Sequence, residues 1–313
     1  MKNALELLVL GAGGMLGTAL QRVAGHRGIP VQAHTEADLD ITDRAALLEV
    51  TASFAARLSR VGGKGTVVNA AAYTDVEGAE DDVDRAHQIN DVAAGWVAVV
   101  AREHGLDLVH VSTDFVFDGT KQGAYTETDE PHPLSVYGSS KLAGEKAVAL
   151  NYPEALTVRT SWTYGPEGTN FPLKILQRAR AAIDSTKHTA GAALLNATSE
   201  PPCMQVVVDE VGSPTYSVDL AGALLDLLVA GASGLYHLAG AGSCSRYELA
   251  LETLRLAGIA VPRDIMVRPV ASDVFPAKAM RPHNSVLDCT KAGSLGVRLP
   301  EWQSGLARFV AEL

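Results

Sequence analysis

Cysteine, metal-binding patterns and long apolar runs are scarce in this chain of 313 residues. Its three cysteines, Cys203, Cys244 and Cys289, are odd in number and show no C-x-x-C spacing, which argues against a disulfide framework and a thiolate metal site. The nine histidines form no H-x-x-x-H or similar pair, so we expect no bound metal. No apolar run approaches the ~20 residues that span a bilayer. The N-terminal apolar run is interrupted by Glu6 and followed at once by a glycine turn, so it reads as a first strand and not as a secretion signal. We therefore expect a cytoplasmic protein with no membrane partner.

Positive charge is also in short supply. Lysine and arginine total 26 against 36 acidic residues, a net charge of -10, and the basic residues form no cluster. Because binding to nucleic-acid phosphates needs clustered Lys and Arg, we expect no nucleic-acid partner. An acidic protein can still hold a phosphorylated small molecule where helix N-termini and one or two arginines supply local positive potential.

The first half of the chain alternates short aliphatic runs with longer amphipathic stretches. This βαβ rhythm is typical of a parallel sheet covered by helices on both faces. Apolar runs such as "TVVNA" and "LDLVHVS" suit strands buried on both sides. The predicted fold is α/β, a doubly wound parallel sheet of the Rossmann type. The predicted strands are 7–10, 31–33, 66–69, 108–111 and 156–159, and the predicted helices are 16–24, 44–60, 79–104 and 139–150.

The rhythm breaks after Pro166. Residues 182–202, "AIDSTKHTAGAALLNATSEPP", are rich in Ala, Ser and Thr without a steady period, which predicts a mobile loop. This loop could gate a pocket or be a tolerated surface insertion. Regular order returns with "MQVVVDEVGSPTY", a helix over 218–230 and a strand within "GLYHLAG".

The stretch "LLVLGAGGMLGTAL" places Gly11, Gly14 and Gly17 in a G-x-x-G-x-x-G spacing between the first predicted strand and the first predicted helix. Glycines there permit a tight turn and let the backbone approach a pyrophosphate at the positive end of the helix. The spacing differs from G-x-G-x-x-G because Leu16 stands where that pattern has its third glycine, and a plain turn is the alternative. The position at the first βα junction favours dinucleotide binding.

The end of the second predicted strand reads "VQAHTEAD", where Glu36 comes only after His34 and Thr35. An NAD site usually has a carboxylate at this strand end. Without that carboxylate the site can accept a 2′-phosphate, although no arginine stands there to bind one. We therefore predict NADPH as cofactor, with NADH also usable. Thr35, Asp40 and Ile41 are predicted to lie at the adenine side, with a loop or N-cap carboxylate as the equal alternative for Asp40.

In "SVYGSSKLAGEKAV", Tyr137 and Lys141 stand four residues apart at the start of a predicted helix. Residues at i and i+4 share a helix face, so both side chains can point into one cleft. Two ordinary residues on a solvated face are the alternative, since such spacing also arises by chance. A nearby ammonium would stabilise the phenolate and lower a pKa that starts near ~10. A tyrosine with a lowered pKa could protonate a developing alkoxide near neutral pH.

The run "LVHVSTDFVFDG" ends a predicted strand with Ser112, Thr113 and Asp114, at the sheet edge where open α/β folds bind ligands. A hydroxyl there could hold a carbonyl oxygen beside Tyr137. Taken alone, the triplet is a turn-forming cluster. Combined with the glycine turn and the Tyr/Lys pair in this chain order, it favours a catalytic site.

These motifs resemble the extended short-chain dehydrogenase/reductase superfamily and, within it, the dTDP-4-dehydrorhamnose reductase family. The resemblance also includes "VVNAAAYTDVEGAE", "VRTSWTYG", "GSPTYSVDLA" and "RPHNSVL". It implies a reductase of dTDP-rhamnose and cell-surface polysaccharide biosynthesis that transfers hydride to the C4 ketone of dTDP-4-dehydro-L-rhamnose. It also implies a dinucleotide-binding domain over 1–165 and 216–241 and a smaller sugar-nucleotide-binding domain over 166–215 and 242–313.

By this resemblance, Tyr137 is the proton donor and Lys141 binds the nicotinamide ribose. Thr113, a third catalytic residue, and Asp114 hold the sugar at its reacting carbonyl. Phe115 follows Asp114, so the Asp-Glu pair of related dehydratases is missing and reduction is favoured over dehydration. The further cofactor-binding residues that the resemblance implies are Gly14, Met15, Leu16, Ala72, Tyr73, Thr74 and Val111.

The substrate pocket is implied to include Trp162, which would pack against the deoxysugar, and Asn170. Arg281 in "MRPHNS" is the best candidate for the substrate diphosphate, because a guanidinium can bind it bidentately. An arginine without a ligand at the surface is the alternative. Asn90 is either the backbone-bending or water-holding asparagine common in the superfamily or, equally, a helix-face amide.

Some members of the family are metal-linked dimers with a glutamate just after the glycine turn. Here Thr18 and Ala19 follow Gly17, so no metal is carried over, although a homodimer stays open. Two other functions also stay open. One is a reductase or epimerase of another nucleotide sugar, and the other is a non-catalytic NAD(P)-binding subunit that resembles the regulatory subunit of methionine adenosyltransferase. Retention of Thr113, Tyr137 and Lys141 together argues against the second.

Overall fold

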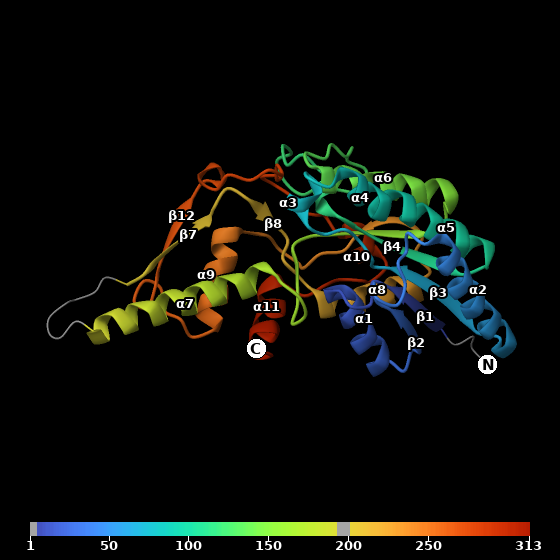
Figure 1. Cartoon of the computed structure of the whole chain (residues 1–313), viewed down its shortest axis with the longest axis horizontal. Helices are drawn as coiled ribbons and strands as arrows, with labels where there is room; N and C mark the ends of the chain where they lie inside the picture. The colour runs from blue at the N-terminus through green and yellow to red at the C-terminus, as the bar shows by residue number, and fades with distance from the viewer. Residues whose placement is uncertain (1–4, 193–200) are drawn as a thin grey trace.

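The computed structural model describes residues 5–192 and 201–313 and contains a six-stranded, all-parallel central sheet (Figure 1). The strand order is β10-β5-β4-β3-β1-β2. The chain therefore adds β2 on one side of β1 and then crosses to β3 on the other side, which makes a topological switch point between β1 and β3. Open α/β sheets bind ligands at the carboxyl ends of the strands at such a point. The strands are β1 (Leu5–Leu10), β2 (Val31–His34), β3 (Lys64–Asn69), β4 (Asp107–Thr113), β5 (Leu156–Thr160) and β10 (Gly234–His237).

Both faces of β1 are covered, as its near-continuous apolar sequence predicts. Leu7 and Val9 belong to a core that includes residues of α1 (Met15–His26) and α8 (Ser217–Val229). Leu8 and Leu10 belong to a second core, with α2 (Arg44–Val61) and α5 (Ala94–Glu103) on the opposite face. Each of these four strand residues is 0% exposed. The sheet is thus a rigid platform whose carboxyl edge positions the loops that follow it.

The helix predicted over 79–104 is wrong as a single element. The structure has α3 (Val76–Ala79), α4 (Val83–His87), the π-helix η1 (Gln88–Ala93) and then α5. Asp82 lies between α3 and α4 with φ -126° and ψ 56°, outside the helical region. Because apolar periodicity is similar in α and π turns, the sequence pattern did not reveal the widened turn, which holds Asn90.

The predicted loop over 182–202 is also wrong for its first part. The helix α7 (Phe171–Ala192) continues through that part, and residues 193–200 lie outside the described residues. Ala182 and Ile183 pack against the core formed with Ile175 and Leu176 of the same helix. Alanine is the best helix former, and no proline interrupts the run before Pro201. The Ser- and Thr-rich composition therefore did not indicate this helix, although these apolar residues along it pack in one core.

Away from the sheet, α7 lies with α9 (Arg246–Leu256) beside the strand pair β7 (Cys203–Val207) and β12 (Met266–Val270), at the left of Figure 1. α6 (Val136–Asn151) packs on η1 and α5 at the sheet. Within the described residues, no helix is both long and apolar enough to cross a membrane. The remaining elements are η2 (Asp114–Val116), β6 (Thr163–Tyr164), β8 (Val211–Gly212), β9 (Thr215–Tyr216), β11 (Cys244–Ser245), η3 (Ser272–Val274), α10 (Thr290–Ser294) and α11 (Trp302–Ala311).

Candidate active site

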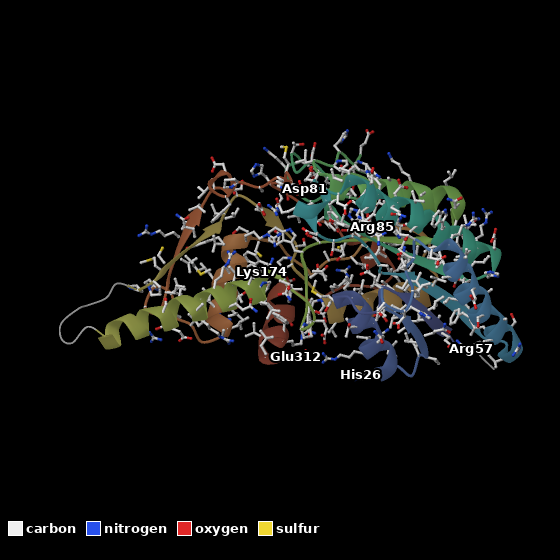
Figure 2. All side chains as sticks on the ribbon, viewed as in Figure 1. His26, Arg57, Asp81, Arg85, Lys174 and Glu312 are labelled. Atoms are coloured by element: carbon white, nitrogen blue, oxygen red, sulfur yellow. The ribbon has the colours of Figure 1, made fainter. Side chains whose placement is uncertain are left out.

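One cleft of about 1460 Å³ runs from the glycine turn across the carboxyl edge of the sheet to α7 and α9. All predicted site residues except Tyr73 line it. Figure 2 shows how far its lining extends, with Arg85 on α4 above the sheet and Lys174 on α7. Its volume exceeds the ~300–1,000 Å³ of ordinary small-molecule pockets. The cleft therefore has room for two ligands of nucleotide size that meet in its middle.

The glycine turn needs two of its glycines for close approach. Gly11 has φ +77°, and a Cβ there would lie 2.5 Å from the backbone nitrogen of Ala71. A Cβ on Gly17 would lie 2.3 Å from the backbone oxygen of Gly11. Gly14 is the N-cap of α1 and makes no side-chain cap bond with the first-turn N–H groups, and residues 14–17 line the cleft. This is the geometry that a pyrophosphate-binding turn requires.

Thr35 and Asp40 line the cleft from the loop between β2 and α2. The hydroxyl of Thr35 donates to Asp38 Oδ2 at 2.7 Å, and Asp40 Oδ1 accepts from the backbone nitrogen of Thr42 at 2.9 Å and from its hydroxyl at 2.7 Å. These bonds, with the Thr42 hydroxyl first, lower the pKa of Asp40. Asp40 thus has the turn-forming role that was the alternative prediction, and it also lines the cleft. Arg85 of α4, which the sequence around β2 could not reveal, lies 3.8 Å from Asp40.

Asn90 braces the backbone after β3. Its Oδ1 accepts from the nitrogen of Tyr73 at 2.8 Å, and its Nδ2 donates to the oxygen of Tyr73 at 3.1 Å and to the hydroxyl of Ser140 at 3.0 Å. Asn90 is thus a buried amide that holds the backbone of Tyr73, not an exposed amide on a helix face. Tyr73 itself is not among the residues that line the cleft, although Asn90 holds its backbone.

Helix α6 presents Tyr137 and Lys141 to the cleft because it approaches its neighbours at two glycines. Ser135 caps the helix by accepting from the nitrogen of Gly138 at 3.2 Å. A Cβ on Gly138 would lie 2.2 Å from the oxygen of Phe115, and one on Gly144 would lie 2.0 Å from the oxygen of Asn90. Only glycine allows this packing, which fixes the helix against the sheet edge.

Tyr137 is partly buried beside Thr113, whose hydroxyl donates to Asp114 Oδ1. Burial raises the pKa of Tyr137 to about 12, the Thr113 hydroxyl lowers it and the charge of Asp114 raises it further. Lys141 donates from Nζ to the backbone oxygen of Val111 at 2.6 Å. The predicted lowering of the Tyr137 pKa by Lys141 is therefore wrong in this structure, because desolvation dominates and the ammonium is directed at a carbonyl.

Lys141 is buried as well. Burial lowers the pKa of Lys141 to about 8, and the charge of Glu145 opposes this shift. Glu145 was not predicted as a site residue. It accepts from the hydroxyl of Ser112 at 2.5 Å and from Arg159 Nε and Nη2 at 2.8 and 2.6 Å. The hydroxyl of Ser112 is therefore held by Glu145, whereas that of its neighbour Thr113 donates to Asp114. The only sequence signal that could have pointed to Glu145 is its position four residues after Lys141 in the same predicted helix.

Asp114 continues the polar edge. Its Oδ1 accepts from the Thr113 hydroxyl at 3.1 Å and its Oδ2 accepts from Ser161 at 2.9 Å. Burial raises the pKa of Asp114, against the lowering by hydrogen bonds from Ser285, Ser161 and Thr113. The carboxyl is thus a firmly held group next to the Tyr137–Thr113 pair.

Three predicted substrate residues have protein partners. Trp162 has φ +44°, a left-handed conformation that is strained for an aromatic residue. Asn170 Oδ1 caps α7 by accepting from Leu173 N at 3.1 Å, and its Nδ2 donates to the oxygen of Gly165 at 2.7 Å. Arg281 Nη2 is 2.5 Å from Glu77 Oε1. A further cleft-lining cation, Arg246, was missed because its place at the start of α9 carries no recognisable motif.

Comparison with known proteins shows which family combines these features. The family model described as the RmlD substrate binding domain matches residues 5–184 and 182–313. The chain belongs to this family. A dTDP-4-dehydrorhamnose reductase from Mycolicibacterium smegmatis is 36% identical to this RmlD-family chain, over 98% of this chain and 86% of that protein. The resemblance drawn from the sequence motifs is thereby confirmed.

Two other relatives of this RmlD-family chain are informative. A dTDP-4-keto-6-deoxy-D-glucose reductase from Streptomyces niveus is 39% identical, over 90% of this chain and 87% of that protein. The crystal structure of a dTDP-4-dehydrorhamnose reductase from Bacillus anthracis in complex with NADP is 31% identical, with a TM-score of 0.85 and full coverage of both chains. The Rossmann-type α/β fold predicted from the alternating pattern is confirmed by this likeness. Within the described residues of this RmlD-family chain, no group of His, Cys, Asp and Glu is arranged to hold a metal ion.

Proposed function

We propose that this protein is an NADPH-dependent dTDP-4-dehydrorhamnose reductase that converts dTDP-4-dehydro-L-rhamnose to dTDP-L-rhamnose. The observation that carries the proposal is the placement of the Tyr137 phenol beside Thr113 in one cleft, one helical turn from the buried ammonium of Lys141. Both side chains line the same cleft as the glycine turn. A proton donor, a cation and a phosphate-binding turn in one cleft are what reduction of a carbonyl by a dinucleotide requires.

The residues present fit NADPH. The first turn of α1 has no side-chain cap, and the nearby Gly13 and Gly14 leave its backbone accessible to a pyrophosphate. Arg85 supplies positive charge near Asp40 in the same cleft. When bound, the reduced nicotinamide supplies the hydride. NADH remains a second cofactor. We propose that the cofactor is held by Gly11, Gly14, Met15, Leu16, Gly17, Thr35, Asp40, Ile41, Ala72, Thr74, Val111, Tyr137 and Lys141.

Tyr137 gives its proton to the oxygen of the C4 ketone as the carbonyl becomes an alcohol. Its raised pKa of about 12 keeps the phenol protonated at neutral pH, which a proton donor needs. The alkoxide that forms on reduction is far more basic than a phenolate, so the transfer is still downhill. Thr113 lies beside the phenol and its hydroxyl can donate to the same oxygen, while the ammonium of Lys141 lines the cleft and binds the nicotinamide ribose.

Substrate binding is proposed for Asp114, Trp162, Asn170 and Arg281. Asp114 lies next to the Tyr137–Thr113 pair and is well placed for a sugar hydroxyl near the ketone. Asn170 shapes the pocket through its backbone-capping bonds. Arg281 would have to share or leave Glu77 to bind a diphosphate, and both side chains are partly exposed, so this exchange has a small energetic cost.

The Streptomyces niveus relative supports a second candidate substrate, dTDP-4-keto-6-deoxy-D-glucose, because it is as similar to this chain as dTDP-4-dehydrorhamnose reductases are. The test is to mix the purified protein with NADPH and each sugar nucleotide and to follow the absorbance of the reduced nicotinamide, with identification of the product. Faster oxidation of NADPH with dTDP-4-dehydro-L-rhamnose than with dTDP-4-keto-6-deoxy-D-glucose is expected. Absence of any sugar-dependent oxidation would contradict the proposal and favour a non-catalytic binding subunit.

The setting of the enzyme is also a proposal. We place it in the cytoplasm, where nucleotide sugars are made, without a nucleic-acid partner and with a homodimer as an open assembly. We further propose that residues 1–165 and 216–241 form the dinucleotide-binding domain and that 166–215 and 242–313 form the sugar-nucleotide-binding domain. The cleft is lined by residues from both.

A further inference from the structure

Arg246, the first residue of α9, occupies a fixed position over Trp162. Its guanidinium carbon lies 3.4 Å from the centroid of the Trp162 ring and 5.1 Å from that of Phe171. Its Nε is 3.5 Å from Glu210 Oε2, and its backbone nitrogen donates to the backbone oxygen of Glu210 at 3.2 Å. Stacking on two rings and a carboxylate on one edge hold the planar group in one orientation.

Trp162 cannot move freely to open its face. A Cβ on Gly212 would lie 2.4 Å from Trp162 Cε2, so the indole packs directly against that backbone. The backbone of Trp162 is left-handed, and strained conformations of this kind persist only where the surroundings hold them. A hexose that approached the face of the indole under Arg246 would meet the guanidinium first.

The guanidinium still has donors to offer. Among the described residues, Nη1 and Nη2 of Arg246 have no hydrogen-bond partner, and the side chain lines the cleft. A guanidinium has five donors, and those left unpaired in a partly buried site favour a polar ligand. Arg246 also lies within electrostatic range of Asp114, which accepts a hydrogen bond from the hydroxyl of Thr113. Its free donors are therefore at the end of the cleft where the carbonyl is reduced.

The charges around Arg246 favour a hydroxyl over a phosphate. Glu210 already accompanies this cation, with side chains that are 18% and 12% exposed, and Asp114 adds a second acidic group. A dianionic diphosphate would meet both carboxyl groups in a desolvated place. A hydroxyl, by contrast, can accept from the guanidinium and donate to a carboxylate at once.

We propose that Arg246, supported by Trp162 and oriented by Glu210, binds the hexose hydroxyl next to the ketone and so determines which epimer is reduced. This inference rests on the proposed function. The two sugars named for relatives of this chain differ in configuration at C3 and C5, and C3 carries the hydroxyl beside the C4 ketone. A site built to hydrogen-bond a hydroxyl discriminates strongly, because the wrong epimer leaves its polar groups unpaired.

The test compares kcat/KM for dTDP-4-dehydro-L-rhamnose and dTDP-4-keto-6-deoxy-D-glucose in the wild type, Arg246→Gln and Arg246→Lys. Loss of a hydrogen bond to a charged group should lower kcat/KM for the preferred epimer by about 10- to 100-fold in both variants, with a much smaller change for the other epimer. The preference between epimers should therefore collapse. Affinities for NADPH and for dTDP alone should not change.

The matched control is Arg255→Gln, at an exposed arginine on the same helix whose only ion pair among the described residues is with Glu252. This variant should leave every value unchanged. An unchanged epimer ratio in Arg246→Lys would overturn the inference. Equal losses for both epimers together with weaker dTDP binding would also overturn it, because they would place the guanidinium at the diphosphate. A wild type that reduces neither sugar would instead refute the proposed function on which the inference rests.

Discussion

The ammonium of Lys141 donates to the backbone oxygen of Val111 at 2.6 Å, which ties α6 to the carboxyl end of β4 four residues after Tyr137. The side chain is buried at 2% exposure, and its pKa is about 8. A cation with this pKa keeps its charge only in part of the range in which proteins work. The bond that orients the catalytic helix face is therefore also a source of pH dependence.

The first prediction is an alkaline decline in activity. Because burial lowers the pKa of Lys141 from 10.5 to about 8, the charged form is present below about pH 8 and is lost above it. The profile of kcat/KM, which reports groups of the free enzyme, should fall with a midpoint near this pKa. Steady-state kinetics between about pH 6 and 10 would check this. A profile that stays level through the alkaline range would contradict it.

The second prediction concerns Glu145, whose charge raises the pKa of Lys141. Glu145→Gln should move the alkaline midpoint to lower pH and destabilise the protein by about 3–5 kcal/mol, because Arg159 is left as a buried charge without its partner. Chemical unfolding and the pH profile measure the two effects separately. Glu103→Gln, an exposed position on α5, is the control and should change neither. A normal midpoint in Glu145→Gln would show that the carboxylate has a structural role alone.

The third prediction is a separation of binding from turnover at Tyr137. Tyr137→Phe removes the proton donor but keeps the ring, whose edge packs against Phe115 with 5.5 Å between centroids. Turnover should fall by about 10²- to 10⁴-fold, while the dissociation constant for NADPH stays close to that of the wild type. Fluorescence titration with NADPH and single-turnover kinetics provide the two measurements. Unchanged turnover would remove Tyr137 from the mechanism.

The fourth prediction compares two glycines of α1. Gly17→Ala would place a methyl group 2.3 Å from the backbone oxygen of Gly11, so the turn must shift and NADPH affinity should fall at least about tenfold. Gly25→Ala meets no atom within 4 Å and should stabilise the same helix by up to about 1 kcal/mol through helix propensity. Thermal unfolding and cofactor titration of both variants test this contrast. Equal cofactor affinity in the two variants would contradict the role of the turn.

The sequence predicted the features whose signal is local. Apolar runs located β1 to β5, and the glycine spacing located a turn that the structure shows to depend on Gly11 and Gly17. The failures have equally physical causes. The break within 79–104 depends on a π turn that apolar periodicity does not distinguish, and the pKa of Tyr137 depends on burial, which a sequence does not state.

Residues that reach the cleft from distant parts of the chain were missed for a related reason. Arg85 and Arg246 are each unremarkable in their local sequence, and only the fold brings them to opposite ends of one cleft. The sequence has no arginine at the end of the second predicted strand, and only residues near that strand were considered for a 2′-phosphate. Arg85 of α4 instead reaches the cleft near Asp40.

The fifth prediction follows from this placement. Arg85 pairs with Asp40 only at 3.8 Å, and both side chains are more than a third exposed, so the pair holds the guanidinium weakly and leaves it available for a phosphate. If Arg85 binds the 2′-phosphate, Arg85→Ala should raise KM for NADPH by about tenfold or more and leave KM for NADH unchanged, because NADH lacks that phosphate. Arg60→Ala, at an exposed position on α2, serves as the control for the loss of one positive charge. Equal effects of Arg85→Ala on both cofactors would instead indicate that Arg85 supports the turn at Asp40, which both cofactors share.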